Sequence, residues 1–147
     1  MRILLMSICL GLSCAGAVRA QTVNGCSRAS ATNLSGQSTL TITFANGNFT
    51  YSPKCVKVDL GTQVTFSGTF VNHPLLGGTV TGGVATPASS GPFVPETNSG
   101  NSKAFTMTSD GDFPYYCTFH GAGLSMNGVV YAGPDPLPDD IFDNGFE

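Results

Sequence analysis

The sequence predicts an all-β protein, a Greek-key β-sandwich built from six to eight short strands. Apolar and polar residues alternate with a period of two in several short runs, and Gly, Asn and Asp turn signals separate these runs. No stretch longer than one turn shows a helical period. Only 10% of the residues are charged, while Gly, Ser, Thr and Asn, which are poor helix formers, are abundant. Short strands separated in this way are typical of a sandwich.

The expected strands follow one another along the chain after a polar lead-in at 21–36 that Cys26 pins. They span residues 39–44, 49–53, 55–60, 64–66, 104–107, 113–117 and 129–131. Pro53 ends the second strand, because proline cannot donate a ladder hydrogen bond. Residues 70–73 are expected to complete the fourth strand and to present His73 at its tip. Residues 76–103 are rich in Gly and Pro, which predicts long connections around short strands.

The two ends of the chain differ in composition from the predicted domain. Residues 1–20 are expected to be a secretory signal peptide, with Arg2 before an apolar stretch that is too short to span a bilayer and a cleavage site after Ala20. The alternative is lipoprotein processing at Cys14. The domain then covers 21–133, and the acidic, Pro-rich residues 134–147 are expected to form a flexible tail. We therefore expect a periplasmic or secreted protein.

Charge excludes one class of partner. Cleavage after Ala20 leaves four basic residues against nine acidic residues, a net charge of −5. Such a chain cannot neutralise phosphates, so nucleic acid is not expected as a partner.

Four side chains make up a candidate copper site. Cys117, His120 and Met126 lie in one short loop, and His73, the only other histidine, lies 44 residues before Cys117. Two His, one Cys and a weakly bound axial Met are the ligands of a blue-copper site. Taken singly, each has a simpler interpretation: a surface histidine, an inert buried thiol, or a methionine that fills a gap in the core. Their combination favours one bound copper ion.

These motifs resemble the cupredoxins, in particular the plastocyanin/azurin-like type 1 copper proteins, over about residues 38–132. The matching positions are Tyr51, Ser52, Pro53, Val58, Gly61, Val64, Phe66 and His73 in the first half, and Tyr115, Tyr116, Cys117, His120, Met126 and Gly128 in the second. The resemblance implies that His73, Cys117 and His120 are equatorial copper ligands and that Met126 is the axial ligand. It also implies a one-electron carrier.

The chain departs from the plastocyanin-type pattern at two points. Five residues separate His120 from Met126, where that pattern has four, and Gly121 and Gly123 could absorb the extra residue. Pro74 follows the first histidine, where the family commonly has an Asn that ties the two ligand loops together. Asn72, with Thr118 as its partner, could replace that Asn.

The cysteine count agrees with this assignment. Cleavage after Ala20 leaves Cys26, Cys55 and Cys117, an odd number for a secreted protein. If Cys117 binds the metal, the other two can pair as a disulfide, and the alternative is two free thiols. Azurin-like proteins carry a disulfide near the N-terminus, so the resemblance favours the pair.

The expected function is electron transfer by a monomer that is not an enzyme and has no small-molecule substrate. Redox partner proteins would dock transiently near His120, against an apolar rim formed by residues 121–124. The alternatives are an extracytoplasmic copper chaperone or copper-storage protein that uses the same ligands, and a binding module without redox function. The related copper enzymes need further metal sites with additional histidines, which this chain lacks.

Overall fold

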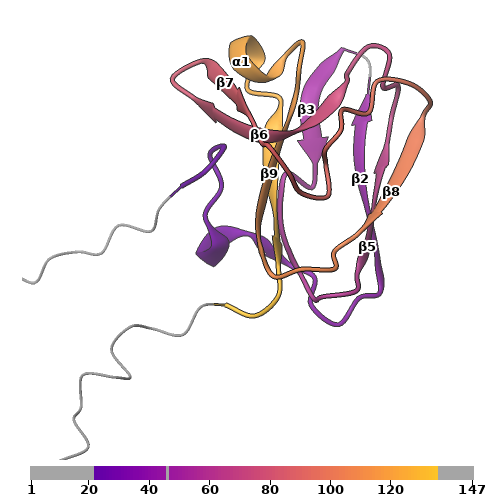
Figure 1. Cartoon of the computed structure of the whole chain (residues 1–147), viewed down its shortest axis with the longest axis vertical. Helices are drawn as coiled ribbons and strands as arrows, with labels where there is room; N and C mark the ends of the chain where they lie inside the picture. Colours follow the sequence, from indigo (N-terminus) through magenta and orange to yellow (C-terminus); the bar gives the residue numbers. More distant parts are fainter. Residues whose placement is uncertain (1–21, 46, 136–147) are drawn as a thin grey trace, which may run out of the picture.

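The computed structural model describes residues 22–45 and 47–135, which form a sandwich of two β-sheets (Figure 1). The described strands are β1 (Thr32–Asn33), β2 (Thr39–Ala45), β3 (Asn48–Ser52), β4 (Cys55–Val58), β5 (Gln63–Ser67), β6 (Leu75–Thr81), β7 (Val84–Pro87), β8 (Ser102–Thr106), β9 (Gly111–Cys117) and β10 (Asn127–Ala132). Two short helical elements accompany them, the 3-10 helix η1 (Arg28–Ser30) and the single-turn helix α1 (Gly121–Leu124).

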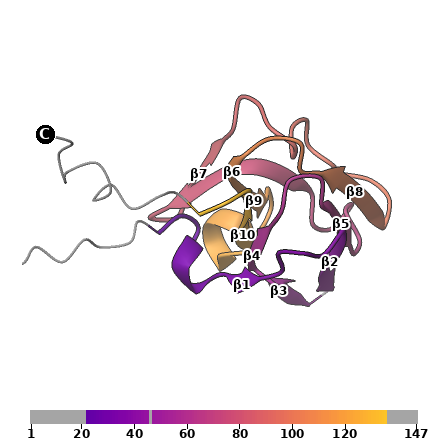
Figure 2. The same cartoon turned by 90° about the horizontal axis from the view of Figure 1, so that it is seen from below.

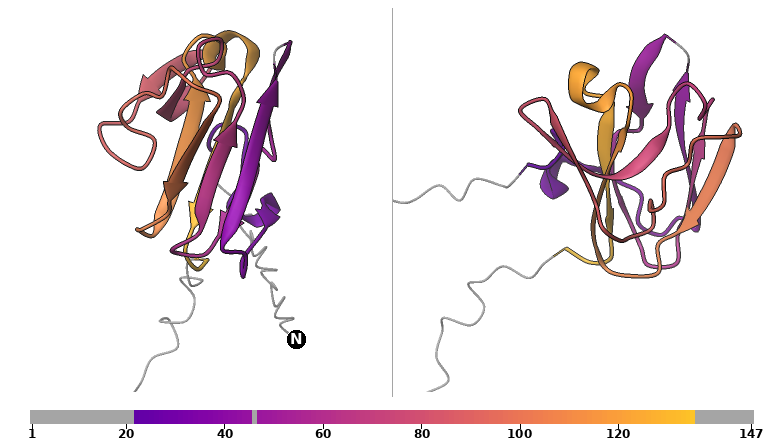
Figure 3. Two further views of the ribbon diagram at one scale, coloured as in Figure 1. Left: turned by 90° about the vertical axis from the view of Figure 1, so that its right-hand side faces the viewer. Right: turned by 45° about the horizontal axis from the view of Figure 1, so that its top comes forward.

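Each sheet mixes parallel and antiparallel pairs. One sheet has the order β1-β4-β10-β9-β6-β7, and the other has the order β3-β2-β5-β8. The pairs β1–β4, β4–β10 and β2–β5 are parallel, whereas the remaining neighbours are antiparallel. Figure 2, which looks at the molecule from below, and Figure 3 show the two layers facing each other. The predicted all-β sandwich is confirmed, with ten strands among the described residues instead of six to eight.

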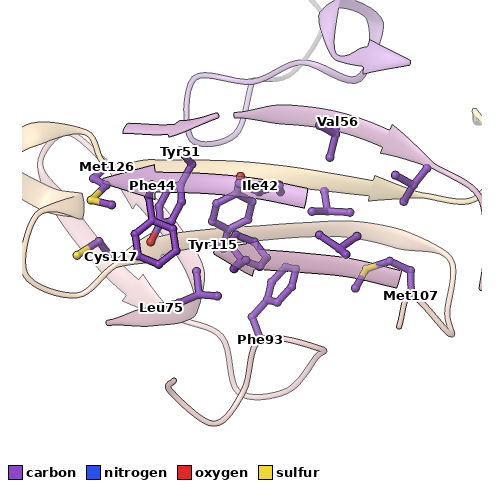
Figure 4. Close-up of a cluster of buried hydrophobic side chains, with 14 of the residues drawn as sticks. Ile42, Phe44, Tyr51, Val56, Leu75, Phe93, Met107, Tyr115, Cys117 and Met126 are labelled. Atoms are coloured by element: carbon purple, nitrogen blue, oxygen red, sulfur yellow. The ribbon is translucent and has the colours of Figure 1, made fainter. Parts of the chain in front are cut away.

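Side chains from both sheets alternate into a shared aromatic core. The strand β2 shows the pattern most clearly, because Ile42 and Phe44 are buried while Thr41 and Thr43 are exposed. The rings of Phe66 and Tyr115 meet at the centre with their centroids 4.9 Å apart. Figure 4 shows Met107 at one end of this core and the sulfur-bearing residues Cys117 and Met126 at the other. The core therefore extends directly to the candidate metal ligands.

The hairpin of β6 and β7 lies in the region where the sequence predicted long connections. The alternation of apolar and polar residues that indicates a strand is missing there, because Gly77 and Gly78 have no side chains. Gly78 has a φ of 146°, and a Cβ atom at this position would overlap the carbonyl oxygen of Thr86 on β7. The close approach of the two strands therefore requires glycine at this position, and the same glycine interrupts the alternating pattern by which a strand is predicted.

The prediction that residues 70–73 complete the fourth strand is wrong. Strand β5 ends at Ser67, and a tight turn follows in which the amides of Asn72 and His73 both donate to the carbonyl of Thr69, at 3.2 and 3.1 Å. The buried ring of Phe70 anchors this turn in the core. His73 therefore lies just before β6, in a turn that the alternating pattern does not describe.

The segment before β2 is held firmly to the larger sheet. Cys26 and Cys55 form a disulfide with a Cα–Cα distance of 5.7 Å, which confirms the predicted pair. Asn24 is buried, and its amide nitrogen donates to the carbonyls of Gly78, Tyr115 and Gly128 at 3.0–3.2 Å. Its side-chain oxygen accepts from the amide of Val80 at 2.7 Å. One asparagine thus joins β6, β9 and β10.

The described chain leaves the domain at the end of the sandwich opposite α1, at the bottom of Figure 1. Arg28 donates to the carbonyl of Pro134 and pairs with Asp135, and Lys57 also pairs with Asp135. The expected signal peptide at 1–20, with Cys14, and the tail from residue 136 onward lie outside the described residues. No helix among the described residues is long and apolar enough to cross a membrane.

Candidate metal centre

The side chains of His73, Cys117 and His120 converge where β9 leads into α1, the helix at the top of Figure 1. The Sγ atom of Cys117 lies 3.4 Å from Nδ1 of His120 and 3.9 Å from Nδ1 of His73. The two Nδ1 atoms are 3.1 Å apart. Cys117 is the free cysteine of the described chain, as the cysteine count predicted. The structure thus brings together three of the four predicted site residues through atoms that can bind a metal.

These separations fit a single metal ion. Metal–nitrogen and metal–thiolate bonds of ordinary length, about 2.0 and 2.3 Å, place ligands at the corners of a planar triangle about 3.5–3.8 Å apart. The three observed distances, 3.1, 3.4 and 3.9 Å, bracket that range. One soft sulfur with two imidazole nitrogens suits copper better than a hard cation, which prefers oxygen ligands. The donor set therefore supports copper binding.

Two aromatic rings pack against His73. Its side chain is only 2% exposed, and the rings of Phe44 and Phe49 each lie with centroids 6.0 Å from its own. Burial, reinforced by the charge of nearby His120, lowers the pKa of His73. A neutral imidazole keeps the lone pair that a metal requires.

Cys117 ends β9 with its thiol in the core. Cys117 pairs with Leu75 on β6, and the Cys117 amide donates to the carbonyl of Met126 at 2.9 Å. Burial raises the pKa of the Cys117 thiol, while the amides of His120 and Phe119 act in the opposite direction. The same amides would stabilise a metal-bound thiolate.

The five residues between His120 and Met126 form helix α1 and the residue after it. Ser125, in the left-handed region with a φ of 57°, reverses the chain after a single helical turn. Gly121 packs directly under Tyr116, where a Cβ atom would lie 2.9 Å from Cδ2 of that ring. The extra residue is therefore absorbed by one compact turn.

Met126 follows this turn and is fully buried. Its carbonyl accepts from Cys117 and its amide donates to the carbonyl of His120 at 3.4 Å, so the backbone places it beside both residues. Figure 4 shows the sulfur atoms of Met126 and Cys117 at the same end of the core. This position is compatible with the axial role that the resemblance implies.

A backbone hydrogen bond joins the segment that carries His73 to the segment that carries Cys117. The amide of Thr118 donates to the carbonyl of Pro74 at 3.0 Å. The hydroxyl of Thr118, which the sequence suggested as a partner of Asn72, donates to Glu96 at 2.7 Å. Because a carbonyl is present in every residue, Pro74 can accept this bond although it has no polar side chain.

One aromatic residue at the site has no counterpart among the predicted functional residues. The ring of Phe49 lies over His120, with centroids 4.6 Å apart and planes inclined by 40°. It also contacts His73, so it covers both imidazoles. In the sequence Phe49 is only one apolar residue of an alternating strand, and no local signal indicates that it faces the histidines.

Comparison with known proteins gives structural neighbours only. No family model matches the sequence, and no curated protein does. A purple cupredoxin from Nitrosopumilus maritimus is 23% identical, with 63% of this chain and 98% of that chain covered and a TM-score of 0.45. An oxidised amicyanin mutant is 20% identical, with 63% and 80% covered and a TM-score of 0.42. A copper-containing nitrite reductase from Thermus scotoductus SA-01 is 21% identical, with 67% and 23% covered and a TM-score of 0.42.

This end of the sandwich carries the thiol of Cys117 and the imidazoles of His73 and His120, three of the four side chains that the residue pattern named. The chain therefore has a His-Cys-His group that fits a blue copper protein, and its structural neighbours include cupredoxins.

Proposed function

We propose that this protein is a one-electron carrier that binds a single type 1 copper ion through His73, Cys117 and His120, with Met126 as the axial ligand. The observation that carries the proposal is the convergence of two Nδ1 atoms and one Sγ atom, which lie 3.1–3.9 Å from one another. When bound, copper supplies a reversible one-electron change between Cu(II) and Cu(I). We do not propose an enzymatic reaction for this protein.

Ligands that keep their positions favour electron transfer, because little energy is then needed to rearrange the site when an electron arrives. His73 is held by a hydrogen-bonded turn and two rings, whereas Cys117 is held by the pairing of β9 with β6. His120 and Met126 are separated by one compact turn. These contacts within the protein support a site whose proposed ligands move little when an electron arrives.

A partner protein would dock around His120, which is the partly exposed member of the group. Phe119 and Leu124, which are 66% and 52% exposed, flank it with apolar surface, and Ala122 is also exposed. Gly121, which the sequence placed in this rim, is buried under Tyr116. A small apolar surface of this kind suits the weak, transient docking of a monomeric carrier.

The compartment belongs to the same proposal. A disulfide between Cys26 and Cys55 persists in oxidising surroundings, which supports a periplasmic or secreted protein. Thiol titration of the unfolded, metal-free and non-reduced mature protein is expected to find one thiol. Three thiols would contradict both the disulfide and the compartment.

The test of the copper site is the absorption spectrum of the purified protein with Cu(II). Thiolate-to-copper charge transfer is expected to give an intense visible band. Cys117→Ser should abolish this band and most of the copper affinity, because a hydroxyl is not a soft anionic ligand. The Cys26→Ser/Cys55→Ser double variant is the control, and it should lose stability while keeping the band.

The same samples separate a carrier from a chaperone or storage protein. A carrier should cycle reversibly between Cu(II) and Cu(I) and should release copper slowly to a competing chelator. Rapid transfer of Cu(I) to the chelator, with no visible band after Cu(II) addition, would favour the chaperone.

A further inference from the structure

The hydroxyl of Tyr51 is an unusual group in the core of this protein. Tyr51 is only 2% exposed, and its hydroxyl oxygen has no hydrogen-bond partner among the described residues. Its ring packs against three others, with centroid distances of 5.3 Å to Phe44, 5.0 Å to Tyr115 and 5.8 Å to Phe66. A buried phenol that satisfies no backbone group is costly to keep, so its position calls for a physical reason.

The hydroxyl points toward the candidate metal centre. Figure 4 shows the Tyr51 side chain crossing the core from β3, with its oxygen at the end where the sulfur atoms of Cys117 and Met126 lie. Burial, together with the charge of the Cys117 thiolate, raises the pKa of the Tyr51 hydroxyl well above its usual value. A tyrosine hydroxyl is protonated at neutral pH in any case, so Tyr51 can act on the site only through its O–H dipole.

Tyr115 provides an internal comparison. It is equally buried, and its ring contacts that of Tyr51. Its hydroxyl, however, donates to the carbonyl of Lys54 at 2.9 Å. The same core thus holds one phenol with a structural partner and one phenol directed at the site.

A free O–H group turns its hydrogen toward the strongest negative charge nearby. With copper bound, the Cys117 thiolate would be the negative charge at the end of the core where the Tyr51 oxygen lies, and a low-dielectric core screens the interaction little. Sulfur that has given electron density to Cu(II) is less negative than sulfur bound to Cu(I). The dipole therefore stabilises the reduced site more than the oxidised site.

We propose that Tyr51 is a positioning residue that acts through Cys117, with its buried hydroxyl favouring the Cu(I) form of the site. This inference rests on the proposed function, since it assumes copper on the Cys117 thiolate. It assigns to Tyr51 a role that is separate from filling the core.

The test compares Tyr51→Phe with Tyr115→Phe, since each variant removes one oxygen atom and keeps the ring. In Tyr51→Phe the preference of the site for Cu(I) over Cu(II) should fall about three- to tenfold, measured as a lower reduction potential. The charge-transfer band should move to lower energy, because the sulfur orbitals lose a stabilising dipole. Tyr115→Phe should leave both properties as in the wild type.

Unfolding of the metal-free proteins gives an independent readout. Tyr51→Phe should unfold at the same or a higher denaturant concentration, whereas Tyr115→Phe should unfold at a lower one because it loses the bond to Lys54. The inference is overturned if Tyr51→Phe keeps the wild-type potential and band, or if it destabilises the metal-free protein as much as Tyr115→Phe does. A wild-type protein with no visible band would contradict the proposed function itself, and this inference with it.

Discussion

The amide of Thr118 donates a hydrogen bond to the carbonyl of Pro74 at 3.0 Å, and this bond joins the two segments that carry the proposed ligands. His73 precedes Pro74 and Cys117 precedes Thr118, so the bond lies one residue beyond each ligand. The next residue, Leu75, already pairs with Cys117 as β6 meets β9. The spacing of the imidazole and the thiol is therefore set by sheet register instead of by a polar side chain after the histidine.

Met126→Leu is expected to retain copper and to raise the reduction potential. The thioether is a weak donor that helps to stabilise Cu(II), and leucine fills the same buried volume without a sulfur atom. Potentiometric titration measures the change. Met107→Leu, at the opposite end of the core, is the control and should keep the wild-type potential. An unchanged spectrum and potential in Met126→Leu would show that Met126 is not the axial ligand.

Phe49→Leu is expected to loosen the histidine pair. The ring covers His120 and contacts His73, and its loss should destabilise the metal-free protein by about 0.5–1.5 kcal/mol, as measured by denaturant unfolding. Release of bound copper to a chelator should also become faster. Phe119→Leu is the matched control, because that ring is more exposed and its centroid lies 6.3 Å from that of His120. Equal effects in the two variants would contradict a special role for Phe49.

Gly121→Ala is expected to destabilise the protein by about 1–3 kcal/mol, because the added methyl group would press on the ring of Tyr116. Gly123→Ala lies in the same helical turn, and its methyl group would meet no atom within 4 Å. That variant should be neutral or slightly more stable, since alanine favours a helix over glycine. Chemical denaturation of the two variants separates the effect of the Tyr116 contact on stability from the effect of helix propensity. An unchanged stability in Gly121→Ala would show that Tyr116 can move aside.

Asn24→Ala is expected to cost about 2–4 kcal/mol in the free energy of unfolding. The substitution leaves buried backbone groups of β6, β9 and β10 without their partner. Asn33→Ala, on the exposed strand β1, should change the same quantity by no more than about 0.5 kcal/mol. A mild effect of Asn24→Ala would indicate that water replaces the amide.

Removal of residues 136–147 is expected to leave the melting temperature and the copper spectrum unchanged, because their composition offers little apolar surface to bury. Removal of 134–147 should lower the melting temperature slightly more, since it also deletes the contacts of Arg28 and Lys57 with Asp135. These ion pairs are exposed, so added salt should reduce the difference between the two truncations. A large fall with the shorter truncation would show that the tail packs against the sandwich.

The sequence by itself determined the fold class, most of the strands and the candidate ligands. The alternation of apolar and polar residues involves only neighbours in the chain, so the sequence could predict strands such as β2, β5 and β9. Ligand chemistry is a property of residue type, so two histidines, a cysteine and a methionine indicated copper before any geometry was known. The disulfide followed once Cys117 was assigned to the metal.

Only the tertiary structure decided how these parts meet. The turn that places His73 depends on Phe70 reaching the core, and the β6–β7 hairpin depends on backbone contact at Gly78. Asn24 binds carbonyls of residues 54 to 104 positions away. Likewise, the positions of Phe49 over His120 and of the Tyr51 hydroxyl toward Cys117 follow from the facing of two sheets. Such contacts depend on register and packing between distant strands, and a local pattern carries no information about either.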